Sequence, residues 1–403
     1  MRARAALMLG LVLGTTGAAP SALAALLHSE QSTTRVAGTV NALRVRGDVS
    51  NVVLLPGRAT SVTAHLEWTL SRPDVTVSLS HGVLTVRATC NDGVGGAVVR
   101  VGLVGTCVDD LSVVLPAASD VVVSTGGSVT ASRFAGPLDL TGENVDVADA
   151  RVPQLHVSAS YDATVRRVDA TAVDLSAVSG TLTADRVTGR SVSLSTGNGG
   201  LRATAIQAAS VSASSSSGDV GLSGSRGQVV DVSSGNGAVN VQDVAAATLT
   251  AKASSGDVSL ARVAARRLEA TSGNGRVSLD DVAADRASAR SSSGDVAVQR
   301  LTGRQLEAGS GNGALSLSDL HLTDIVAKSS SGDVSLETSD IPDRVTAGSG
   351  NGLVTLRVPK AAYYIVASSG NGTVSIDGLT SDRFARREIT ATSSSGDVHI
   401  SGT

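Results

Sequence analysis

The chain has 403 residues, including 44 Gly and 8 Pro but only 1 Trp, 3 Tyr and 2 Phe. Apolar residues make up 41% and charged residues 17%, which excludes a long, highly charged disordered segment and leaves Val, Leu, Ala and Ile to build the core. The net charge of −3 comes without a basic run, which excludes the electrostatic footprint of a nucleic-acid-binding protein and of a polybasic membrane anchor.

Residues 1–24 have the pattern of a secretory signal peptide. Arg2 and Arg4 form a positive start, an apolar stretch follows over residues 5–14, and residues 22–24 (Ala-Leu-Ala) offer a small-x-small cleavage site. The apolar stretch is too short to cross a bilayer, and no later stretch is long enough, so we expect no membrane span. The sequence therefore predicts export to a periplasm, the cell surface or the medium.

Residues 25–111 are expected to form an N-terminal β region that caps the fold. Apolar and polar residues alternate over residues 54–70 and 75–86, which is the strand signal. Cys90 and Cys107 are the two cysteines of the chain, and an oxidising compartment favours a disulfide between them. Closing this loop is expected to contribute about 3 kcal/mol in the chain-entropy model.

Residues 112–403 are expected to form a repeat array, whose period is clearest from residue 190. Ser-Gly-Asp-Val recurs with a constant period of about 38 residues, and Gly-Asn-Gly recurs between these copies with nearly the same period. The glycines of the first motif are Gly218, Gly256, Gly294 and Gly332, and the second motif opens at Gly197, Gly235, Gly273, Gly311 and Gly350. The basic unit averages about 19 residues, a period typical of solenoids.

Within each unit the hydrophobic period is two. Val258 and Leu260 are expected to point inward and Ser259 outward, with the phase slipping before Val263. Short strands that recur without helices between them should stack coil on coil, about 4.8 Å apart. The predicted fold class is therefore all-β, a parallel β-helix with about 19 residues per coil, and the right-handed form is expected because parallel crossovers are right-handed.

The turns have a physical rationale that needs no ligand. Glycine accepts a positive φ, so Gly294→Ala is expected to destabilise its turn, and Asn or Asp caps a turn through its side chain. We expect one structural ladder in which Asp and Asn alternate, which lowers the repulsion between carboxylates from roughly 0.9 to 0.4 kcal/mol. The ladder comprises Asp219, Asn236, Asp257, Asn274, Asp295, Asn312, Asp333 and Asn351. Calcium binding by these carboxylates is the alternative, but one carboxylate per two coils is few for 6–8 oxygen ligands, and no cofactor or metal is expected.

The serine tracts that precede these turns have two readings. They are solvated strand ends and turn formers, or they present a flat hydroxyl array to ice or glycans.

These repeated Ser-Gly-Asp-Val and Ser-Gly-Asn-Gly turns, in a glycine-rich chain with an export signal, resemble the bacterial DUF4097 family of β-strand repeat proteins, which are often labelled adhesins. The resemblance is strongest over residues 190–403 and weaker over residues 35–190. It implies a β-helix in the cell envelope or outside it. It supplies no catalytic residues.

The residues and the resemblance together predict a non-enzymatic element of the envelope, with an adhesin-like binding or structural role and a cell-surface or envelope component, such as a glycan, as its partner. One alternative is a polysaccharide-active β-helix enzyme, although the residues of the acidic pairs Asp109-Asp110 and Asp280-Asp281 should face opposite ways on a strand. The other alternative is a periplasmic scaffold that self-associates through its C-terminal coil.

Overall fold

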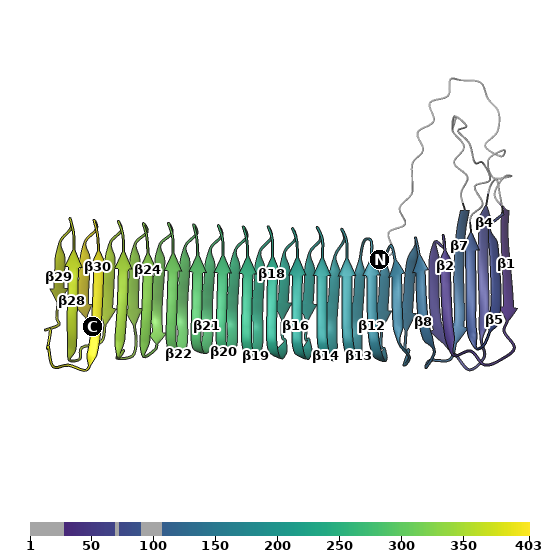
Figure 1. Cartoon of the computed structure of the whole chain (residues 1–403), viewed down its shortest axis with the longest axis horizontal. Helices are drawn as coiled ribbons and strands as arrows, with labels where there is room; N and C mark the ends of the chain where they lie inside the picture. The colour runs from purple at the N-terminus through teal and green to yellow at the C-terminus, as the bar shows by residue number, and fades with distance from the viewer. Residues whose placement is uncertain (1–27, 69–71, 90–106) are drawn as a thin grey trace, which may run out of the picture.

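The protein is a parallel β-solenoid, drawn out into a rod in which successive strands lie side by side (Figure 1). The structure is a computed structural model that describes residues 28–68, 72–89 and 107–403. In these ranges all regular secondary structure is β, with 31 strands. None of the described residues belongs to a helix of the length and apolar character that a membrane span requires.

The N-terminal end of the rod combines antiparallel and parallel strands. Its strands are β1 (His28–Arg35), β2 (Ala42–Gly47), β3 (Asn51–Pro56), β4 (Ser61–Trp68), β5 (Asp74–Ser80), β6 (Val83–Thr89) and β7 (Cys107–Leu115). The pairs β1–β4, β4–β7 and β5–β6 are antiparallel, and His28 stacks on Trp68 with ring centroids 5.5 Å apart. In contrast, β2 and β3 pair in parallel with β8 and β9. Parallel pairing with the later coils therefore reaches back to Ala42, within the region that the sequence predicts to be the cap.

The central coils follow one another in chain order. Their strands are β8 (Asp120–Thr125), β9 (Ser128–Ser132), β10 (Leu138–Gly142), β11 (Val145–Ala148), β12 (Arg151–Ala159), β13 (Ala163–Ala177), β14 (Leu182–Thr196), β15 (Leu201–Thr204), β16 (Gln207–Ser215), β17 (Val220–Ser223), β18 (Arg226–Ser234), β19 (Val239–Ala253), β20 (Val258–Ser272), β21 (Val277–Ser291), β22 (Val296–Ser310), β23 (Leu315–His321) and β24 (Asp324–Ser329). From β13 to β22 partner residues on neighbouring coils keep one constant offset, as in the pair Val258↔Val277, which confirms the expected coil length.

One coil, β20 with its following turn, shows why the sequence folds this way. Val258 and Leu260 point inward from the first segment and are buried. Arg262 then takes a left-handed conformation (φ 51°), which turns the chain and explains the slip in the hydrophobic phase before Val263. After a short middle segment, Leu268 begins a second inward-facing stretch. Each coil therefore has a first segment, a middle segment and a last segment, and the glycine turn leads to the next coil.

The C-terminal coils do not follow chain order. Their strands are β25 (Val334–Thr338), β26 (Arg344–Ser349), β27 (Val354–Val358), β28 (Tyr363–Ser369), β29 (Val374–Asp377), β30 (Arg387–Ser393) and β31 (Val398–Gly402). Strand β30 pairs with β26 on one side and with β28 on the other, and β31 likewise lies between β27 and β29. The coil that comes last in the sequence is thus the penultimate one in space, and β28–β29 end the rod (Figure 1).

Candidate functional site

Glycines form a continuous column along the turn edge of the rod. Their role at most of these positions is to permit close stacking and not, as the sequence suggested, a positive φ. At Gly294, φ lies outside the positive range, but an added Cβ would lie 2.3 Å from the carbonyl oxygen of Gly275 on the neighbouring coil. The same contact recurs at Gly256, whose added Cβ would lie 2.1 Å from Gly237 O. The backbones of adjacent coils therefore leave no room for a side chain here.

The carboxylates of the Ser-Gly-Asp-Val turns cap main-chain groups of the next coil. Asp219 Oδ1 accepts a hydrogen bond of 2.8 Å from the backbone N–H of Ala238, and Asp257 Oδ1 accepts one of the same length from Arg276. Asp295, Asp333 and Asp397 make the equivalent bond at 2.7–2.9 Å. These bonds satisfy N–H groups that would otherwise need water or a ligand.

The register corrects the expected single ladder of alternating Asp and Asn. Val220 pairs with Val239, so Asp219 lies beside Ala238, and Asn236 lies two residues earlier in its turn. The Asp column therefore alternates with Ala238, Arg276, Ala314 and Leu353, while the exposed Asn236, Asn274, Asn312 and Asn351 occupy a different column. The physical reason is that the two turn motifs follow each other at alternately shorter and longer intervals, whereas the length of the coil stays constant. Carboxylates still recur on every second coil, about 9.6 Å apart.

A column of serines, buried in all but the outermost coil, joins each turn to the previous one; the sequence placed the serine tracts among solvated strand ends and turn formers. Ser291 Oγ donates to Gly275 O at 2.9 Å and accepts from the backbone N–H of Gly294 at 2.9 Å. The same pair of bonds is made by Ser215, Ser234, Ser272, Ser310, Ser329, Ser349, Ser369 and Ser393. Ala253 interrupts the column. In the sequence, each of these serines stands three residues before the glycine whose backbone N–H it accepts, as Ser291 stands before Gly294.

A second column follows the corner after the first segment of each coil. Residues at this corner of successive coils take φ between 51° and 59°: Arg167, Arg186, Ala205, Gly224, Asp243, Arg262, Asp281, Arg300 and Asp319. Non-glycine residues rarely adopt this conformation. Ion pairs link some neighbouring coils, and Arg262 bonds both carboxylate oxygens of Asp243 at 2.6 and 3.1 Å. The Arg167 guanidinium, which hydrogen-bonds Asp149, lowers the pKa of that carboxyl.

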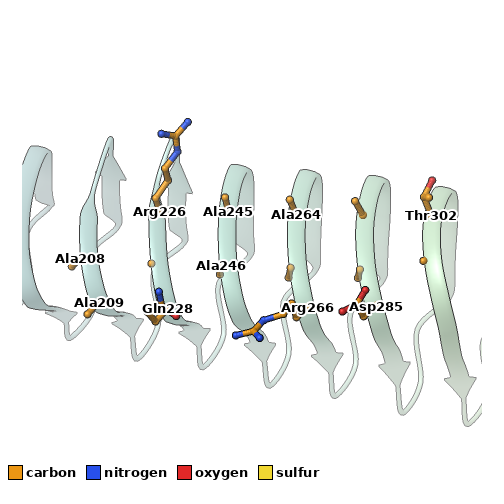
Figure 2. A pocket seen from close by; sticks show the side chains of 15 residues that line it. Ala208, Ala209, Arg226, Gln228, Ala245, Ala246, Ala264, Arg266, Asp285 and Thr302 are labelled. Atoms are coloured by element: carbon orange, nitrogen blue, oxygen red, sulfur yellow. The ribbon is translucent and has the colours of Figure 1, made fainter.

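The middle segments of the coils form a shallow groove of about 910 Å³ that runs along the rod (Figure 2). It exists because the side chains are small along one column and, over three coils, along the column beside it. Ala245, Ala264 and Ala283 are partners in one column, and Ala246, Ala265, Ala284 and Gly303 are partners in the next. The groove extends over the coils from Ala208 to Gly303, which is about 24 Å at the usual strand spacing. We call it the alanine groove.

Polar side chains stand at the two rims of the alanine groove. On one rim, Arg226 and Thr302 stand at the two ends of the column of Ala245, Ala264 and Ala283, and Gln228, Arg266 and Asp285 lie on the other rim (Figure 2). Arg226, Arg266 and Asp285 have no ion-pair partner among the residues that the structure describes. An apolar floor with a few planar polar groups at its edge is typical of ligand sites.

The other candidate residues are dispersed. Asp280 pairs with Arg300, while its neighbour Asp281 belongs to the corner column, so the two carboxylates do not act together. Among the described residues, no three His, Cys, Asp or Glu side chains converge as metal ligands. The predicted disulfide lies outside the described residues, since Cys90 is not among them.

Comparisons with known proteins place the chain in a family. The family described as Toastrack DUF4097 matches residues 40–258 and 228–403, so the chain belongs to it and the expected resemblance is confirmed. The search of curated proteins gave no match. Among solved structures, a putative cell adhesion protein from Clostridium sporogenes is 8% identical, with 93% of this chain and 100% of that chain covered and a TM-score of 0.18. A putative adhesin from Bacteroides fragilis is 11% identical, with coverages of 93% and 97% and a TM-score of 0.16.

Proposed function

We propose that the protein is an exported, non-enzymatic binding rod of the bacterial envelope, with an adhesin-like role. Export is supported by the signal pattern of residues 1–24. The observation that carries the binding role is the alanine groove, a concave surface on a rigid stack of coils. Rigid elements position a binding surface at low entropic cost.

The shape of the groove favours an extended ligand that lies along the rod. The groove crosses successive strands, whose main-chain groups are already paired with neighbouring coils, so a peptide could not add to it as a further strand. The rims offer guanidinium, amide, carboxylate and hydroxyl groups, which can hydrogen-bond to hydroxyls. We therefore propose an unbranched glycan of the cell surface or envelope as the ligand.

Filling the groove tests this proposal. The double variant Ala264→Arg and Ala283→Arg places two long side chains over the floor, at positions that are exposed and in register on β20 and β21. The matched control Ser259→Arg and Ser278→Arg makes the same change on the first segments of the same two coils. Both variants should melt as the wild type does, because neither replaces a core residue.

The assay is cosedimentation with isolated envelope polysaccharides and with fixed cells. We expect the wild type and the control to bind and the groove variant to lose at least tenfold in affinity. Equal binding by all three proteins would show that the alanine groove is not the binding site. No binding by the wild type would contradict the proposed function itself. A rise in reducing ends during the incubation would instead favour the polysaccharide-active enzyme.

A further inference from the structure

The C-terminal coil occupies a slot between two coils of its own chain. We call residues 387–402 (β30–β31) the inserted coil, residues 363–377 (β28–β29) the outer coil, and residues 378–386, which connect them, the return segment. The inserted coil is in register on both sides, with Ile389 paired to Val345 of β26 and to Ile365 of β28. The outer coil therefore lies two strand spacings from β26–β27, and the inserted coil fills the slot between them.

The slot selects a segment with the pattern of the inserted coil. Ile389, Ala391, Val398 and Ile400 point into the core and are at most 1% exposed. The turn of the inserted coil is fixed from both sides, because Ser393 Oγ donates to Gly352 O at 3.0 Å and Asp397 accepts the Thr373 N–H at 2.7 Å. A second copy of this chain carries a segment that meets all of these requirements.

The outer end of the rod has apolar side chains that the described chain leaves exposed, although the Arg383 guanidinium lies over the ring of Phe384. Val374 and Ile376 of β29 are 42% and 39% exposed, whereas their partners on the inserted coil are buried. Phe384 in the return segment is 79% exposed. Half of the ten exposed large hydrophobic residues in the described ranges lie between residues 364 and 384. This end is therefore the apolar end surface of the rod.

The return segment is attached to the rod by Leu379, which packs against the core, and by the backbone and hydroxyl contacts of Ser381 and Asp382. Ser381 Oγ accepts a hydrogen bond of 3.0 Å from the backbone N–H of Ile365, and the backbone N–H of Asp382 donates to Tyr363 O at 2.8 Å. A segment of this length reaches about 30 Å when extended, which exceeds several strand spacings. The segment also carries both signs of charge, including Asp382 and Arg383, so two such ends need not repel each other.

We propose that the slot accepts the inserted coil of a second copy, so that two chains exchange residues 387–402 and join end to end as a dimer. The exchanged coil makes the same contacts that it makes within one chain, which is why exchange of an identical element is a low-cost route to a dimer. The two return segments cross the junction. Val374, Ile376 and Phe384 of both copies are then covered there.

Single cysteines on partner positions test the exchange in the full chain. Thr346 and Thr390 are Cα partners on β26 and β30 and lie on the outer face. One tagged copy carries Thr346→Cys, a differently tagged copy carries Thr390→Cys, and both are made in the same cells. The control pair is Val326→Cys with Thr346→Cys, which are partners on β24 and β26, two strands that follow chain order.

After mild oxidation, the products are analysed by light scattering and by mass spectrometry of cross-linked peptides, which separates the new bridges from those of the native cysteines. We expect a dimer of the two tagged copies that is joined between positions 346 and 390, and no bridge in the control pair. Monomers with free thiols at both positions would overturn the proposal, and so would equal bridging in the two pairs. The binding assay above is independent of this outcome, because the groove lies within one chain.

Discussion

Gly294→Ala adds one methyl group at the place where two turns touch. The new Cβ would lie 2.3 Å from Gly275 O, 2.5 Å from Gly275 C and 2.8 Å from Asn274 O, whereas ordinary contact begins at 3.4 Å. The atoms in the way are backbone atoms of a stacked coil, so the two turns must separate by about 1 Å, roughly a fifth of the usual strand spacing.

The cost can be estimated from two contributions. Forcing an extra methyl group into a packed region costs about 1–3 kcal/mol. Separating the turns of Gly294 and Gly275 also weakens the hydrogen bond that joins them, from Ser291 Oγ to Gly275 O, which is worth about 1 kcal/mol. We therefore expect a local destabilisation of about 3 kcal/mol. The control is Gly309→Ala, where the nearest atom to an added Cβ is 3.7 Å away and φ is not positive, so we expect a change within about 0.5 kcal/mol.

Hydrogen exchange followed by mass spectrometry is the assay, because the coils of a solenoid open locally and this method reports the opening of each coil. A change of about 3 kcal/mol corresponds to exchange on the order of 100-fold faster over residues 272–313. Gly309→Ala should leave these rates unchanged. If the two variants exchange alike, the close stacking of turns is not what the glycine column provides.

Three further predictions concern the turns and corners of the coils. Gly224→Ala should lower stability by about 1 kcal/mol in thermal melts, because only the left-handed conformation opposes the methyl group there, and Ala205→Gly in the same column should shift the melt upward or leave it unchanged. Ser291→Ala should lower stability by about 1–3 kcal/mol in the same melts, because two main-chain groups lose their hydrogen-bond partner. Ala253→Ser should raise stability, because it completes the serine column. A melt of Ala253→Ser that shifts downward would contradict this. The hydrogen bonds from the main-chain N–H and the hydroxyl of Thr373 lower the pKa of Asp397. The contribution of this carboxylate to the stability of the fold is therefore present above the unfolded pKa of about 3.9 and is lost as the pH falls through the lower folded pKa. Asp397→Asn should therefore lose less stability than the wild type when melts at about pH 6 and below about pH 4 are compared, and parallel losses would be the refuting result.

Much of the fold could be predicted because the residues that define the repeat act within their own strand or turn. The alternation of Val258 and Leu260, which returns in every coil, suffices for a parallel stack. The slip before Val263 was visible in the sequence, but only the structure shows that Arg262 makes the corner with a positive φ. The predicted pairing of Asp with Asn was wrong because the spacing of the motifs does not fix the register when the two motifs stand at different positions within turns of equal length.

The remaining features depend on which coils are neighbours. The alanine groove appears only when Ala245, Ala264 and Ala283 are aligned in register, since each is an ordinary residue within its own coil. The inserted coil has the same pattern as every other coil, so its sequence does not reveal its place. The one signal was the stretched interval between Gly370 and Gly396, which provides the residues of the return segment.

The most direct test of the account is where the rod lies on the cell that makes it. Intact producing cells are treated with a protease that cannot cross the outer layers, and the protein is followed beside a periplasmic control. A surface-displayed binding rod should be cleaved or released while the control survives. Complete protection of the protein together with the control would contradict the adhesin-like role and leave a scaffold within the envelope.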